Sequence, residues 1–227
     1  MTINEKIDRY CSYFDEELNR INSLQSRLHS KTLLMVILDT LARVRNPIID
    51  SNRERFLRLI TECADWADGE RVTLYQLSLV PSLSGPLHHK AIQSVANWPF
   101  MRSQHLEADP FISELLHLAD NDIQKKAIME AKHINLLYTY RNHLIHEFRE
   151  PGHASETDHK KHAPYYLCCD MNQQEKVDKN TWELVYPLGF FIKLVRSSLI
   201  TVRKHLQDNT LDPYSFYDFG TMWKRKI

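Results

Sequence analysis

The side chains best suited to chemistry lie in one short segment, Arg141-Asn142-His143-Leu144-Ile145-His146. On a helix, Asn142 and His146 are i,i+4 neighbours on one face, and Arg141 borders that face. An imidazole titrates near neutral pH and can both take and return a proton. A guanidinium matches the oxygens of a phosphate and stabilises negative charge that develops on them. These groups suit the attack of a ribose 2′-hydroxyl on its neighbouring phosphodiester without a metal. The pattern therefore predicts RNA as the substrate, because DNA lacks that hydroxyl.

One long amphipathic helix is expected to position this segment. It would begin at Asn121, which can cap it, and run to about Phe148. At the rise of an α-helix its length would be roughly 40 Å. Pro151-Gly152 would prevent its continuation. Its apolar residues recur at spacings of three and four: Ile128, Ala131, Ile134, Leu137, Tyr138, Leu144, Ile145 and Phe148.

The order Arg-Asn-x-x-x-His resembles the Arg-x4–6-His signature of the HEPN superfamily, in which a polar residue, often Asn, commonly follows the Arg. The resemblance covers about residues 110–206. It implies a helical bundle that dimerises, so that two copies of the motif face each other in one cleft. Many members are metal-independent endoribonucleases of toxin–antitoxin, CRISPR-associated and other defence systems. By this resemblance Arg141 and His146 are the catalytic pair, and Asn142 orients them.

The partners that the resemblance implies are an RNA substrate, a second copy of the chain, and a cognate antitoxin or regulatory protein. Non-cleaving HEPN domains also exist. The alternative function is therefore a non-catalytic HEPN-like module that dimerises or binds a nucleotide or a partner. A further alternative is that Arg141 and His146 belong to an ordinary solvated helix surface.

A metal-dependent hydrolase is the third alternative, because the segment after the motif is rich in histidine. The candidate ligands are His143, His146, His153, His159 and His162. They complete no coordination sphere at a recognised spacing. We therefore expect no metal and no cofactor.

The composition narrows the class of protein. The 227 residues hold 29 Lys and Arg against 29 Asp and Glu, so the formal net charge is zero. This balance argues against a protein that coats nucleic acid non-specifically, although it leaves room for a local basic cleft. Only 5 residues are glycine, which disfavours glycine-rich phosphate loops.

Several features indicate a cytoplasmic protein with no membrane partner. The longest apolar run, Leu33 to Leu38, is far shorter than the roughly 20 residues that span a bilayer. The first ten residues are polar and do not resemble a secretory signal. Four cysteines lack CxxC spacing and are expected to be reduced thiols: Cys11, Cys63, Cys168 and Cys169.

The predicted fold is mainly α, a HEPN-like helical bundle with a small β-hairpin inserted before the last long helix. We expect a single domain over residues 1–227 with its HEPN-like core at about 110–206. Helices within residues 4–65 would pack on this core, and residues 66–106 would form an irregular insert.

Local signals set the expected boundaries of the elements. Thr2-Ile-Asn-Glu5 and Ser51-Asn-Arg-Glu54 read as capping boxes, and Ser30 could cap the helix between them. Asp109-Pro110 is expected to begin another helix. Residues 165–169 and 182–186 are expected to be two strands joined by a polar turn over 170–180, before a helix that starts at Pro187.

Overall fold

The computed structural model describes residues 1–98, 103–152, 156, 162–169 and 181–216. Contacts divide the chain into two compact units. The terminal unit joins Met1–Asp65 to Ile192–Ile227, and the central unit is Trp66–Phe191. The expected single domain over residues 1–227, with a core at about 110–206, stays a prediction.

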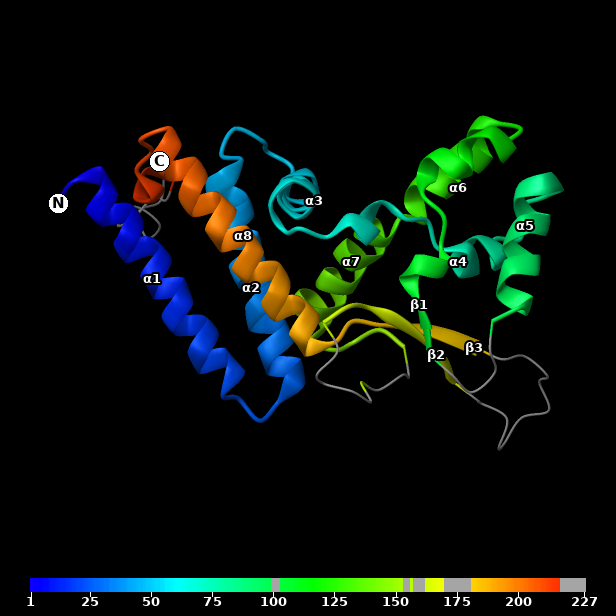
Figure 1. The fold of residues 1–227 in the computed structure, drawn as a ribbon, viewed down its shortest axis with the longest axis horizontal. Helices are drawn as coiled ribbons and strands as arrows, with labels where there is room; N and C mark the ends of the chain where they lie inside the picture. The colour runs from blue at the N-terminus through cyan, green and yellow to red at the C-terminus, as the bar shows by residue number, and fades with distance from the viewer. Residues whose placement is uncertain (99–102, 153–155, 157–161, 170–180, 217–227) are drawn as a thin grey trace, which may run out of the picture. The chain divides into compact units, whose positions relative to one another are not determined.

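Both units are built mainly of helices, and a small antiparallel sheet precedes the last long helix (Figure 1). The predicted mainly α fold, with a small β element before the last long helix, is therefore confirmed. Within the described part of the chain, no helix is both long and apolar enough to cross a membrane.

The terminal unit contains α1 (Ile3–Asn22), α2 (Arg27–Arg45), α3 (Asn52–Cys63) and most of α8 (Leu188–Asp208) (Figure 1). Buried apolar side chains from all four helices form its core, among them Ile7, Phe14, Leu38, Leu41, Phe56, Val195 and Val202. Polar contacts add to this packing. Arg203 of α8 donates to Asp8 of α1, and the Thr201 hydroxyl donates to the Cys63 carbonyl of α3 over 3.4 Å.

The capping predictions for α1 and α3 are confirmed. Thr2 accepts a hydrogen bond from the backbone of Glu5, whose carboxylate accepts one from Thr2 in return. Ser51 accepts from the backbone of Glu54. The prediction for α2 was wrong, because Ser26 rather than Ser30 caps it.

Cysteine accessibility in the terminal unit gives a first testable prediction. Burial, more than any other cause, raises the pKa of the Cys11 thiol to about 11. The thiolate is the reactive form, so at pH 8 only about one Cys11 in a thousand is reactive. Replacing Cys11 with serine should leave the fast phase of Ellman's reaction unchanged in the folded protein, and should remove one equivalent after denaturation. A smaller fast phase in the variant would contradict this.

The sheet of the central unit has the order β1-β2-β3 and is antiparallel throughout. Strand β2 (Tyr165–Cys169) has the predicted bounds, and β3 (Thr181–Val185) lies one residue earlier than predicted. Strand β1 (Ser103–His105) was not predicted, and it pairs with β2. The turn expected over 170–180 lies outside the described residues.

Residues 66–106 are more regular than expected, because they contain α4 (Leu74–Ser78) and α5 (Gly85–Ala96). The prediction of a helix that begins at Asp109-Pro110 was wrong. Two short 3₁₀ turns, Ile112–Glu114 and Leu116–Leu118, take its place. The Pro110 carbonyl accepts the Val72 N–H and is therefore tied to a distant segment.

The prediction of one helix from Asn121 to Phe148 was also wrong. The chain forms α6 (Asp122–Glu130), α7 (His133–Asn142) and a π-helical turn (His143–Glu147). The break between α6 and α7 has a tertiary cause. The Ala131 carbonyl accepts the Thr73 N–H, and the His133 N–H donates to the Arg71 carbonyl, each over 3.0 Å. These backbone groups are thus bonded to residues 71–73.

Candidate active site

The predicted site lies where α7 passes into the π-helical turn. Arg141 and Asn142 end α7, and His146 belongs to the turn. On a regular α-helix, residues five apart are rotated by roughly 140° and do not face each other. A π turn is wider, with hydrogen bonds from residue i+5 to residue i, and it reduces this rotation. The turn therefore brings His146 back over Arg141.

The guanidinium of Arg141 is the centre of the site. Its Nη1 donates to Asn142 Oδ1 over 2.9 Å, and lies 3.4 Å from His146 Nε2. A guanidinium can only donate, so a hydrogen bond across this distance has Nε2 as its acceptor. The structure thus brings together all three residues that the sequence singled out.

The two ionisable side chains of the site differ in exposure. Only 9% of Arg141 is exposed, whereas His146 is exposed to solvent. The Arg141 Cζ also lies 5.7 Å from the ring centroid of Tyr138, a separation at which an aromatic face attracts a cation. The cation is therefore fixed in place, while the imidazole can be reached by a ligand.

The residues just beyond the motif hold the turn. Phe148 adopts a left-handed conformation, with φ of 51°, and its N–H donates to the His143 carbonyl. Glu147 pairs with His143 Nδ1 over 3.0 Å and with Arg149 Nη2 over 2.6 Å. The nearby His143 is the main cause that lowers the pKa of Glu147, so its carboxylate stays charged at neutral pH.

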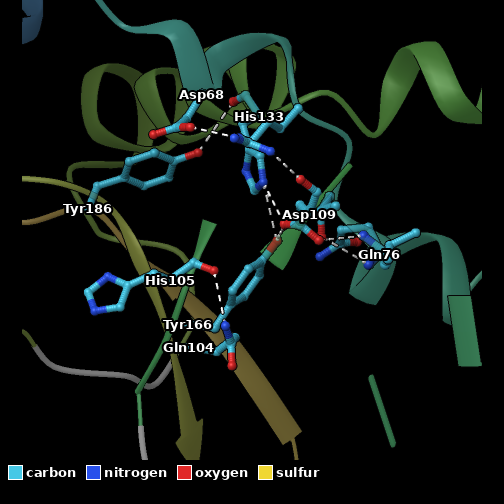
Figure 2. Close-up of polar contacts among 11 residues, drawn as sticks. Asp68, Gln76, Gln104, His105, Asp109, His133, Tyr166 and Tyr186 are labelled. Atoms are coloured by element: carbon cyan, nitrogen blue, oxygen red, sulfur yellow. Dashed lines mark hydrogen bonds and ion pairs between the residues drawn. The ribbon is translucent and has the colours of Figure 1, made fainter. Parts of the chain in front are cut away.

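Sequence reasoning missed a second polar cluster in the central unit, made of Asp109, His133 and Tyr166 (Figure 2). All three are buried. Asp109 Oδ2 accepts a hydrogen bond of 2.6 Å from the Tyr166 hydroxyl and lies 2.8 Å from His133 Nε2. Burial and the neighbouring Asp109 raise the pKa of Tyr166 well above its ordinary value, so the hydroxyl keeps its proton.

This cluster connects four stretches of the central unit. Asp109 Oδ1 accepts the N–H of Leu74, the first residue of α4, over 3.0 Å. Arg71 Nη1 donates to the Asp109 carbonyl over 2.7 Å, and the Tyr186 hydroxyl donates to the His133 carbonyl over 3.4 Å. Because none of the three central side chains reaches solvent, the cluster stabilises the fold and does not meet a substrate.

The alternative of a metal-dependent hydrolase requires a cluster of metal ligands. Among the described residues, no three His, Cys, Asp or Glu side chains are placed to hold a metal ion. Of the histidines that follow the motif, His162 is exposed, and His153 and His159 lie outside the described residues.

Comparisons with known proteins identify no relative of this chain. The chain matches no protein-family model, no curated protein and no solved structure.

Proposed function

We propose that this protein is a metal-independent endoribonuclease of the HEPN type, acting through Arg141, Asn142 and His146. The observation that carries the proposal is the 3.4 Å approach of Arg141 Nη1 to His146 Nε2 across the π-helical turn. A fixed cation next to an accessible imidazole is the minimum needed to cleave RNA through its own 2′-hydroxyl.

In the proposed reaction His146 moves protons. Its Nε2 lone pair takes the proton of the ribose 2′-hydroxyl, whose oxygen then attacks the adjacent phosphorus. The 3.4 Å contact with Arg141 is long for a hydrogen bond and costs little to give up when substrate arrives. A proton returned to the departing 5′-oxygen completes cleavage. The products carry a 2′,3′-cyclic phosphate and a 5′-hydroxyl.

Arg141 stabilises the phosphate in this proposal. Negative charge grows on the non-bridging oxygens as phosphorus becomes five-coordinate, and the guanidinium donates to those oxygens. Asn142 positions the guanidinium through the 2.9 Å contact of its Oδ1 with Nη1. Burial of Arg141 strengthens its interaction with the phosphate, since water screens it less.

The proposal includes a homodimer in which two motifs share one cleft, a cytoplasmic location, and restraint by a cognate antitoxin or regulatory protein. One feature supports an interface at the motif. The side chain of Phe148, two residues after His146, is 50% exposed. Aromatic residues are enriched at protein–protein interfaces, and a second chain that covered Phe148 would bury this ring.

The test is to incubate purified protein with a fluorescently end-labelled RNA in the presence of EDTA. We expect cleavage, with 2′,3′-cyclic phosphate ends detected by mass spectrometry. A matched substrate with 2′-deoxyribose at the cleaved position should remain intact. Cleavage of the deoxy substrate, or loss of activity in EDTA, would contradict the mechanism. An intact dimer that cleaves no RNA would favour the non-catalytic alternative.

A further inference from the structure

A second candidate site lies in the central unit, in a pocket of about 420 Å³ beside strand β3. Its walls come from α4, α7, the Pro151-Gly152 turn and β3. The buried rings of Tyr140, Trp182 and Tyr186 contribute to its lining, while Leu79 and Thr139 lie at exposed positions. This volume and this aromatic lining are typical of sites for small planar ligands.

The edge of β3 gives the pocket a hydrogen-bonding pair. β3 is the last strand of the sheet, and the Trp182 N–H donates to the Tyr75 hydroxyl over 3.1 Å, so it points away from β2. Backbone groups of alternate residues point the same way along a strand, so the N–H and C=O of Leu184 also point away from β2. Among the described residues, no hydrogen-bond partner of these two groups is found.

This edge is too short for a peptide to add a strand. A bound strand pairs with several successive residues, and Tyr75 already takes the N–H of Trp182. Leu184 offers one complete donor and acceptor pair before β3 ends at Val185. One pair fits the edge of a small ring system.

The charge of the pocket lining narrows the class of ligand. Of the described residues that line it, none is a lysine or an arginine, and Glu183 supplies the carboxylate. This carboxylate lies against Gly152, where an added Cβ would come within 2.5 Å of Glu183 Oε2. Burial is the first cause that raises the pKa of Tyr140 and of Tyr186, so both hydroxyls stay neutral. A phosphate is therefore disfavoured, and an amine is favoured.

We propose that this pocket binds a nucleobase that carries an exocyclic amine, as a free nucleoside. A ring nitrogen next to the amine accepts from the Leu184 N–H, and one amine hydrogen is donated to the Leu184 carbonyl. The second amine hydrogen is donated to Glu183. This inference does not rest on the proposed ribonuclease function, because the pocket contains neither Arg141 nor His146.

Calorimetric titration of the whole chain with adenosine and inosine tests the proposal. Inosine has a carbonyl where adenosine has its amine, so we expect adenosine to bind at least about tenfold more tightly. AMP should bind no more tightly than adenosine. The Glu183→Gln variant should lower the ratio of the two affinities, because an amide can also donate to the inosine carbonyl. The ratio should stay above one, because N1 of inosine carries a hydrogen and cannot accept from the Leu184 N–H.

Two further variants complete the test. Thr139→Trp should fill the pocket and weaken adenosine binding at least about tenfold. Glu107→Gln, at an exposed glutamate that does not line the pocket, should bind like the original protein. His146→Ala should also keep the adenosine affinity, which separates this site from the ribonuclease proposal. The proposal would be overturned if the original protein did not bind adenosine at millimolar concentration. It would also be overturned if Glu183→Gln and Thr139→Trp both bound adenosine and inosine with the affinities of the original protein.

Discussion

Replacing His146 with alanine is expected to slow RNA cleavage by about 100- to 10,000-fold, the usual contribution of a positioned acid–base group. The loss should appear mainly in kcat, because the imidazole acts on protons that move only during the reaction. His117→Ala is the matched control, since His117 is also an exposed histidine of the central unit but lies outside the motif. The measurement is the single-turnover rate with labelled RNA. Equal rates for His146→Ala and His117→Ala would reject the assignment.

A variant of Arg141 is measured in the same experiment. Arg141→Lys keeps a positive charge but loses the planar fork that contacts both Asn142 and His146. We expect a loss of about 100-fold or more, comparable to the removal of a donor from an oxyanion site. Because Arg141 is 9% exposed, its replacement could also disturb packing. Circular dichroism and the melting temperature of each variant separate a catalytic loss from a folding defect.

Replacing Asp109 with alanine is expected to destabilise the central unit by about 3–5 kcal/mol, because it removes the shared acceptor of a buried hydrogen-bond cluster. The change leaves three buried donors without their acceptor: the Leu74 N–H, the Tyr166 hydroxyl and His133 Nε2. Each buried donor left unpaired costs about 1–3 kcal/mol, so the expected loss corresponds to the lower part of the summed penalty of about 3–9 kcal/mol.

Urea denaturation followed by circular dichroism measures this effect. Asp122→Ala is the control, because its side chain is 97% exposed and its partner, Lys125, is also solvated. The control should change the free energy of unfolding by less than about 1 kcal/mol. Asp109→Asn should fall between the two, since its amide oxygen can still accept a hydrogen bond. A loss below 1 kcal/mol for Asp109→Ala would show that the cluster contributes little.

Local signals predicted those parts of the fold that depend on neighbouring residues. Thr2 and Ser51 bond to backbone groups three residues away, so their patterns identify the start of α1 and α3 directly. The strands β2 and β3 were likewise visible in their own residues. The predictions that were wrong concern features that depend on residues distant in the sequence. The break between α6 and α7 comes from hydrogen bonds with residues 71–73, about 60 positions earlier in the chain.

The candidate site shows the same limit. The identities of Arg141, Asn142 and His146 could be chosen from the sequence, because their chemistry follows from residue type. Their geometry could not. On the expected regular helix Arg141 borders the face of Asn142 and His146, and the π-helical turn that brings Arg141 and His146 together was not predicted. Asp109 was interpreted as a helix cap because a proline follows it. Its carboxylate instead meets His133 and Tyr166, 24 and 57 positions away, which no local pattern encodes.

The π-helical turn has a consequence for how this segment should be aligned with others. A π turn amounts to one residue inserted into an otherwise regular helix. An arginine and a histidine four apart on an α-helix also face each other. Deletion of one residue between Arg141 and His146 would therefore restore regular winding and still leave the pair in contact. An alignment through this segment should allow a one-residue gap here, because the spacing can drift over generations without separating the two side chains.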